Sequence, residues 1–295
     1  MTRFVAPPSR RRALTIAAGM VMAAVLPRPR SARAAQGQSN DPFGSGQSNL
    51  PIEIEAEQGI EWRKNEKVYI ARGNATAKRG DQTVYADTLT AHYRDKPDGG
   101  SEIWQIEADG HVRMTSPDRT ATGEHAVYNL DTRVLQMTGS NLRVDTGKET
   151  LTARDGIEYQ DNALIAIARG NAVMVQGTKQ VTADKMTGHF ERQTDGKSRL
   201  VRVEANGNVQ VKTPNTFATG NEGDYDVDKD FMTLTGNVKV TNGQNQFNGE
   251  HAEVDVKSGV SRLVGGSDGT GKVKSLIMPS SSSPSSSSSP PKTSP

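Results

Sequence analysis

Apolar and polar residues alternate with a period of two along most of the chain between residues 51 and 278. In the segments 52–56, 209–212 and 238–241, every second residue is Ile, Val or Ala, and the residues between them are charged or polar. Successive side chains of a β-strand point to opposite faces, so this pattern predicts half-buried antiparallel strands. Turn residues recur about every eight to twelve positions, which is typical of many short strands. We therefore expect an all-β fold over residues 51–278.

A glycine followed by a short alternating segment recurs six times within this region. The spacings between successive glycines are 37, 29, 31, 37 and 29 residues, so the series starts again after 97 residues. We interpret each glycine as part of a turn that precedes a strand. The six are Gly73, Gly110, Gly139, Gly170, Gly207 and Gly236.

Residues outside this glycine series repeat at the same offset of 97. Residues 59–62, Gly-Ile-Glu-Trp, align with residues 156–159, Gly-Ile-Glu-Tyr, and Ala86 aligns with Ala183. An internal repeat of this kind predicts a stacked array in which each unit buries its apolar face against its neighbours. The predicted units are one copy at about 53–149, a second at 150–246 and a partial third at 247–278.

The two ends of the chain differ in composition from this body. Three arginines at 10–12 precede an apolar run at 13–26, and residues 32–34 are Ala-Arg-Ala. That run is shorter than the roughly 20 residues that a membrane-spanning helix needs, so we predict a cleaved signal peptide over 1–34, used by either the general secretory or the twin-arginine pathway. Residues 35–50 are predicted to be a flexible leader, and 279–295 a disordered Ser/Pro-rich tail.

Charge and composition restrict the function further. The whole chain has a formal charge of +2, but without residues 1–34 it has 29 basic and 34 acidic residues, which argues against nucleic-acid binding. The chain has no cysteine, so disulfides and thiolate metal sites are excluded. Hydrophobic residues make up 33% and aromatic residues 5%, which favours a thin core over a thick globular one.

Three patterns that suggest chemistry have simpler interpretations. Residues 266–272 fit the start of a phosphate-binding loop, but Val273 stands where Ser or Thr is needed. His92 and His189 occupy the same repeat position, which explains them without a metal. The many carboxylates alternate with apolar residues, as on a solvated sheet face, and none is singled out as an acid or base. We expect no catalytic residue, no cofactor and no metal.

One family does share the repeated pattern. The segment 52–57, then Arg72-Gly73-Asn74-Ala75, then Ala86-Asp87 followed by Tyr93, resembles the OstA-like domain of the LptA family, over about residues 50–265. The resemblance implies an elongated, open β-jelly-roll and a non-enzymatic periplasmic carrier of lipopolysaccharide. It also implies partners: lipid A, further copies of the chain joined head to tail, an LptC-like inner-membrane protein and an LptD-like outer-membrane protein.

The apolar residues that we take to point inward are the candidate site. From the residues alone, they form either an ordinary core or an apolar trough that is open to a ligand. The resemblance favours the trough, which would hold lipid A. The candidate lining residues are Ile52, Ile54, Val68, Ile70, Val112, Met114, Leu142, Val144, Ile165, Ile167, Val173, Val175, Val209, Val211, Val238 and Val240.

Two alternatives of other classes stay open. A parallel β-helix enzyme that degrades polysaccharides also has repeats, although its coils of about 20 to 25 residues fit the observed spacing poorly. A surface adhesin built from β repeats is the second alternative.

Overall fold

The computed structural model describes residues 52–97, 99–194, 198–255, 261–265 and 272–277. The predicted signal peptide, leader and tail lie outside these residues, as does Gly266 with most of the loop-like stretch that follows it. The described part of the chain contains eighteen β-strands and no helix, so no helix there could cross a membrane. The all-β prediction is confirmed.

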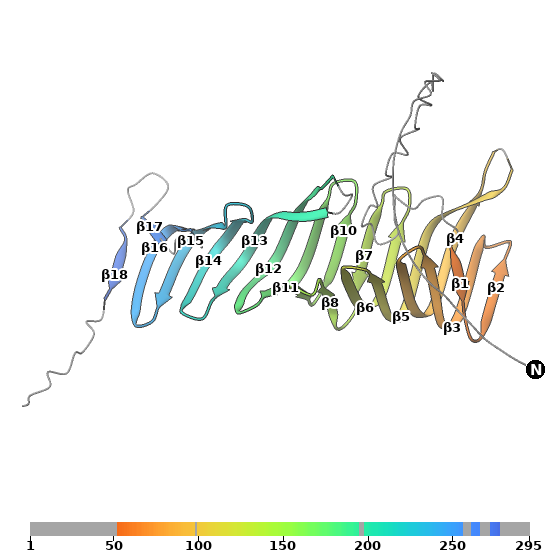
Figure 1. Ribbon diagram of the computed structural model, residues 1–295, viewed down its shortest axis with the longest axis horizontal. Helices are drawn as coiled ribbons and strands as arrows, with labels where there is room; N and C mark the ends of the chain where they lie inside the picture. Colours follow the sequence, from red (N-terminus) through yellow and green to blue (C-terminus); the bar gives the residue numbers. More distant parts are fainter. Residues whose placement is uncertain (1–51, 98, 195–197, 256–260, 266–271, 278–295) are drawn as a thin grey trace, which may run out of the picture. The chain divides into compact units, whose positions relative to one another are not determined.

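The strands follow one another along the chain, and Figure 1 shows most of them side by side in sequence order. Their bounds are β1 Glu53–Glu55, β2 Gly59–Arg63, β3 Val68–Arg79, β4 Gln82–Asp95, β5 Ser101–Ser116, β6 Arg119–Asn129, β7 Val134–Thr138, β8 Leu142–Asp145, β9 Glu149–Ala153, β10 Gly156–Gln160, β11 Ile165–Gln176, β12 Lys179–Arg192, β13 Ser198–Lys212, β14 Thr216–Asp226, β15 Phe231–Asn242, β16 Asn245–Asp255, β17 Ser261–Val264 and β18 Lys274–Leu276.

The internal repeat is present at the level of whole strands. β3 and β11 have the same length and begin 97 residues apart, and the same holds for β4 with β12 and for β6 with β14. At the junction of the copies, β7 and β8 both pair with β6, and they continue the sheet through β10 and β9, which both pair with β11. All pairings between described strands are antiparallel.

The repeated glycines are not at hairpin turns, which corrects the sequence-based interpretation. Five of the six lie inside long strands, where the register shifts by one residue, as at Gly73 between Arg72 and Ala75 of β3. Gly73 and the following Asn74 both have positive φ, 79° and 44°, and the other copies of the pair share this conformation. Two consecutive left-handed residues insert a β-bulge, which bends the strand and keeps it paired. The sixth, Gly139, has a φ of 101° and lies between the short strands β7 and β8.

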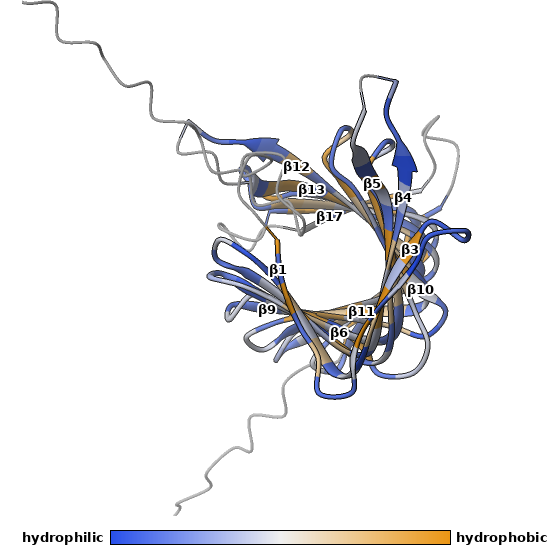
Figure 2. Ribbon diagram, turned by 90° about the vertical axis from the view of Figure 1, so that its right-hand side faces the viewer, coloured by the Kyte–Doolittle hydropathy of each residue, from blue (hydrophilic) through white to orange (hydrophobic). Residues whose placement is uncertain are grey.

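The bulges let each long strand contribute side chains to the core on both sides of the bend. In β3, Ala71 before the bulge and Ala75 after it are both buried in the same hydrophobic cluster. Seen along the array in Figure 2, the strands curl about a common axis, with hydrophobic residues along them and hydrophilic ones in the connecting turns. We call the side of the sheet that carries this cluster the inner face.

One line of directly paired residues crosses the inner face from β2 to β17, and we call it the core row. Large and small side chains alternate along much of it, so that neighbours interlock. The core row consists of Ile60, Ala71, Leu89, Ala108, Ala126, Met137, Ile157, Ala168, Met186, Ala205, Gly223, Leu234, Ala252 and Leu263.

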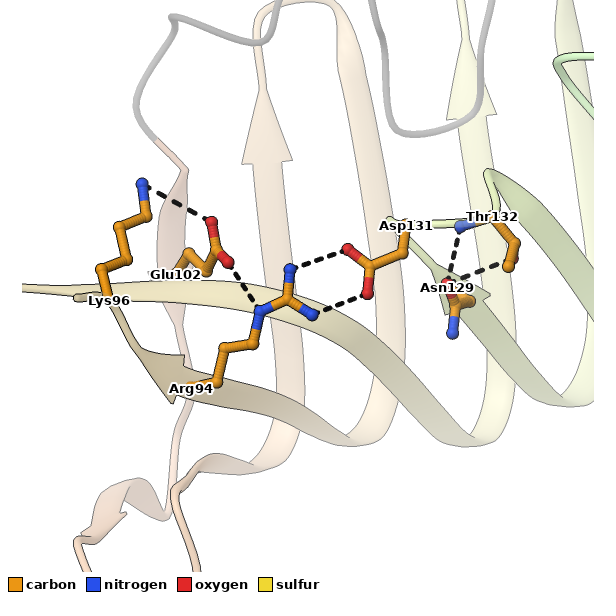
Figure 3. Close-up of polar contacts among 6 residues, drawn as sticks. All are labelled: Arg94, Lys96, Glu102, Asn129, Asp131 and Thr132. Atoms are coloured by element: carbon orange, nitrogen blue, oxygen red, sulfur yellow. Dashed lines mark hydrogen bonds and ion pairs between the residues drawn. The ribbon is translucent and has the colours of Figure 1, made fainter.

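Ion pairs join the ends of consecutive strands in both copies. In the first copy, the guanidinium of Arg94 binds Glu102 of β5 at 2.6 Å and Asp131, after β6, at 2.8 Å (Figure 3). In the second copy the first two charges are exchanged, since Glu191 stands at the position of Arg94 and Arg199 at that of Glu102. Arg199 pairs with Asp228 and, at 3.8 Å, with Glu191. The bridging pattern has thus been kept while the residue that carries the positive charge has moved to the next strand.

We predict that Gly207→Ala destabilises the fold by about 2–3 kcal/mol, because a left-handed residue with a Cβ is strained and this Cβ would overlap the carboxylate of Asp184. The matched control is Gly177→Ala, where φ is also positive at 57° but a Cβ would meet no atom within 4 Å. The control should cost only about 1 kcal/mol. Urea denaturation of both variants measures the difference, and equal losses would contradict the close contact at the bulge.

Candidate functional site

A second line of paired residues, next to the core row on the inner face, carries the candidate site. We call it the cavity row. It crosses both copies without interruption from β2 to β16. It consists of Trp62, Tyr69, Ala91, Ile106, Tyr128, Leu135, Tyr159, Ala166, Gly188, Val203, Tyr225, Met232 and Val254.

A cavity of about 520 Å³ opens at the two smallest adjacent residues of the cavity row, Ala166 and Gly188. Its walls come from β6 to β13, together with Asp118 just before β6 and Val227 just after β14, and are mostly apolar. Its volume lies within the roughly 300–1,000 Å³ that small-molecule sites occupy. The apolar walls include Leu135, Val144, Leu151, Tyr159, Met174, Phe190 and Leu200.

Charged side chains stand at the rim of this cavity. Arg119 is the first residue of β6, Lys148 directly precedes β9, and Arg199 lies at the start of β13. Asp118 and Glu149 are the acids beside Arg119 and Lys148. Arg119 lies 3.5 Å from Asp118, and hydrogen bonding to Asp228 raises the pKa of Arg199 above its ordinary value. Within the described residues no ion pair involves Lys148. The site therefore combines an apolar interior with a rim that presents cations.

Nine of the predicted lining residues point to the inner face. Val144 lines the cavity, and Val209 and Val211 line a neighbouring space of about 20 Å³. Leu142 and Val238, like Val209, are only 1% exposed, so in this structure they act as packing residues of the core. The nine are Ile54, Val112, Met114, Leu142, Val144, Val209, Val211, Val238 and Val240. Ile52, two residues before Ile54, is half-buried.

Six others point the opposite way, which corrects their expected inward orientation. In β11 the core and the cavity contain Ala166, Ala168 and Met174, so the residues between them face outward. The reason is that β11 is apolar at both parities, as in Ile-Ala-Ile-Ala at 165–168, so alternation alone does not choose a face. The six are Val68, Ile70, Ile165, Ile167, Val173 and Val175. Val68 and Ile70 are nevertheless buried, at 6% and 7% exposure, outside the cluster of the inner face. Whether any predicted residue contacts lipid stays a prediction.

Several residues that line the cavity were not predicted from the sequence. The predicted lining was limited to Ile, Val, Leu and Met, so the aromatic Tyr159 and the small Gly188 were not considered. Met174 lies between Val173 and Val175, which were predicted in its place, and no lining residue was predicted in β12, which carries Met186 and Phe190. Their signal is the repeat itself, because an alignment at 97 residues shows where the second copy has lost side-chain volume relative to the first.

The remaining polar clusters of the described residues do not form a metal site. No group of three or more potential ligands among His, Cys, Asp and Glu meets in the described part of the chain. His92 and His189 lie 3.2 Å and 3.4 Å from Glu107 and Glu204, so the repeat-related histidines have repeat-related partners. The hydrogen bond to Asp87 raises the pKa of the exposed His111.

Comparison with known proteins places the chain in a family. The model of the family described as "LptA/(LptD N-terminal domain) LPS transport protein" matches residues 53–160 and again 154–260, once for each copy of the repeat. An uncharacterized protein of Rhizobium meliloti (strain 1021) is 30% identical over 123 residues, which are 40% of this chain and 66% of that protein. The chain thus spans just under two thirds of that relative.

A solved structure also aligns with the chain. It is that of LptH, the LptA homologous periplasmic component of the lipopolysaccharide transport device of Pseudomonas aeruginosa. The alignment has 14% identity, covers 79% of this chain and 99% of LptH, and has a TM-score of 0.20. Because the two family matches together cover more than half of the sequence, this chain belongs to the LptA/(LptD N-terminal domain) family of LPS transport proteins.

Proposed function

We propose that this protein is a non-enzymatic periplasmic carrier that binds the lipid A part of lipopolysaccharide on its inner face. The observation that carries the proposal is the apolar cavity at Ala166 and Gly188, in a chain that belongs to a family of lipopolysaccharide transport proteins. The predicted signal peptide supports the location. The protein would bridge an LptC-like protein of the inner membrane and an LptD-like protein of the outer membrane.

The physical need for such a carrier lies in the acyl chains. Each methylene kept out of water is worth about 0.8 kcal/mol, so one chain of about a dozen carbons represents roughly 10 kcal/mol. An apolar cavity open at one side can shield such a chain while the headgroup stays in water. The cations at the rim, Arg119, Lys148 and Arg199, suit the phosphates of lipid A.

The strand pairing bears differently on the two alternative functions, a polysaccharide-degrading β-helix and a surface adhesin. A parallel β-helix is contradicted by the pairing of the described strands, all of which is antiparallel. An adhesin built of β repeats is compatible with the strands, and cell fractionation distinguishes it, since an adhesin would be exposed at the cell surface.

We predict that lipopolysaccharide is captured from the cavity wall and not from the outer face. A photo-crosslinking amino acid at Val144 or Met174, both of which line the cavity, should form a lipopolysaccharide adduct on irradiation. The matched control is Arg143, the exposed neighbour of Val144 in β8. Adducts are detected by immunoblotting for lipopolysaccharide. Capture from Arg143 alone would contradict an inner-face site.

Assembly is the second part of the proposal, and the repeat provides its argument. β10 pairs with both β7 and β11, whereas its equivalent β2 pairs with β3 and with no other described strand. Consequently Ile60 and Trp62 are 54% and 58% exposed, while their equivalents Ile157 and Tyr159 are 7% and 8% exposed. The apolar face of β2 is therefore exposed at the first edge of the array, whereas the same face of the equivalent strand β10 is covered.

The last described strands supply a second apolar edge. Leu276 of β18 and the adjacent Ile277 are 58% and 65% exposed. Free strand edges recruit further strands, and contact between two different ends of identical molecules propagates head to tail. We propose that copies of this chain, and the related domains of its membrane partners, join through these edges and extend the inner face.

We predict that the mature protein without residues 279–295 forms oligomers whose size rises with concentration. Ile60→Glu should weaken the association about tenfold or more, because it places a charge in the joint. Phe217→Glu, at another exposed apolar residue that lies away from both ends, is the control and should leave association unchanged. Light scattering over a concentration series measures the effect. A protein that is monomeric throughout would contradict assembly and leave the carrier function untouched.

A further inference from the structure

The two copies of the repeat differ where the cavity row crosses equivalent strands. In the first copy, Tyr69 of β3 pairs with Ala91 of β4, and in the second, Ala166 of β11 pairs with Gly188 of β12. The register of these two strand pairs is the same in both copies, so the pairs themselves differ in side-chain volume. The second copy lacks a phenol ring at one position and a methyl group at the next.

In the first copy, aromatic rings occupy this part of the inner face. The ring of Tyr69 stacks on Trp62 at a centroid distance of 6.0 Å and lies 5.0 Å from the ring of Tyr93. The indole Nε1 of Trp62 donates a hydrogen bond of 2.9 Å to the hydroxyl of Tyr93 and ties the outer two residues together. Three side chains from three strands thus form one packed group.

In the second copy the outer two aromatic residues remain and the middle one is missing. Tyr159 and Phe190 stand at the positions of Trp62 and Tyr93, and their rings meet edge to face at 6.3 Å. Ala166 stands at the position of Tyr69, and the cavity of about 520 Å³ is lined by all three of these residues. None of its lining residues precedes Asp118, so the cavity belongs to the second half of the array and its junction with the first.

The residues next to these aromatic side chains also differ between the copies, in their charge. Leu200 lines the cavity and is the equivalent of Ile103, and each pairs with the aromatic residue of the preceding strand, Phe190 or Tyr93. The neighbouring residue is Arg199 in the second copy and Glu102 in the first. A cation therefore stands beside the cavity where the first copy has a carboxylate.

We propose that Ala166 and Gly188 are specificity-determining residues that make the second copy the place where an acyl chain of the cargo is held. The first copy is kept closed to it by Tyr69. This inference rests on the proposed carrier function, and it adds where along the inner face the chain lodges and which side chains decide it. An array with a single holding position retains one amphiphile at a defined place instead of distributing acyl chains evenly along its length.

The test compares equivalent positions of the two copies, with purified lipopolysaccharide as the probe. A photo-crosslinking amino acid is placed at Leu200 or at Ile103, and the yield of adduct is measured in three backgrounds. Ala166→Tyr restores the missing ring, Tyr69→Ala opens the first copy, and Val175→Tyr, on the opposite face of the same strand β11, is the control. Circular dichroism and the thermal midpoint verify that each variant keeps its β structure.

We expect capture at Leu200 and little at Ile103 in the parent protein. Ala166→Tyr should lower capture at Leu200 about tenfold, since excluding about two methylenes from the cavity is sufficient for that. Val175→Tyr should not change it. Tyr69→Ala should create capture at Ile103, a gain that loss of folding does not produce.

Two results would overturn the inference while the carrier function stands: equal capture at Ile103 and Leu200 in the parent, or unchanged capture at Leu200 in a folded Ala166→Tyr. A parent protein that captures no lipopolysaccharide at Leu200, Val144 or Met174 would instead overturn the carrier function, and the inference with it. The two failures are therefore distinguishable.

Discussion

The structure depends on a backbone conformation that few residues adopt, two consecutive left-handed residues in the middle of a strand. A residue with φ near +80° followed by one near +48° is found at Gly110 and His111, at Gly170 and Asn171 and at Gly207 and Asn208. Glycine is required at the first position, because there a Cβ would run into an acidic side chain, Asp87 of β4, Asp155 between β9 and β10, or Asp184 of β12. Asparagine, which tolerates this region better than most residues, suits the second. Since the bulges stand at equivalent places in the long strands, they bend all these strands along one line.

Because the bend is repeated, the sheet acquires an inner face that continues from copy to copy. Directly paired residues then form lines across the array, and each line has its own packing rule. The core row alternates large and small side chains along much of its length and includes fully buried residues such as Met137 and Leu234. The cavity row follows no such rule, and its volume varies from Trp62 to Gly188. Stability thus resides mainly in one row, which leaves the next row free to differ between the copies.

The same duplication explains why the ends and the middle of the array are chemically different. An interior strand has neighbours on both sides, and its apolar residues are covered, as Ile157 and Tyr159 of β10 are. The equivalent strand at the first edge has the same sequence character and no such cover within the described chain. Similar local sequence therefore produces core in one place and an apolar surface in another.

Much of this was predictable from the sequence. Alternation fixed the all-β class, and the spacing of the glycines revealed the 97-residue repeat, because both depend on local backbone preferences that a sequence displays directly. The strand pairs 68–79 with 165–176, and 82–95 with 179–192, reproduce that offset.

The position of the cavity was not predictable in the same way. At 165–168 both parities are apolar, so only the pairing of Ala168 with Ile157 and Met186 decides which side is inner. The bulges likewise looked like turns, since a Gly-Asn pair favours positive φ in either setting and only the neighbouring strands determine whether the chain reverses or continues. Local chemistry thus determined the repeat and its period, whereas the face that each residue presents, and the space left at Ala166 and Gly188, were decided by register between strands that are distant in sequence.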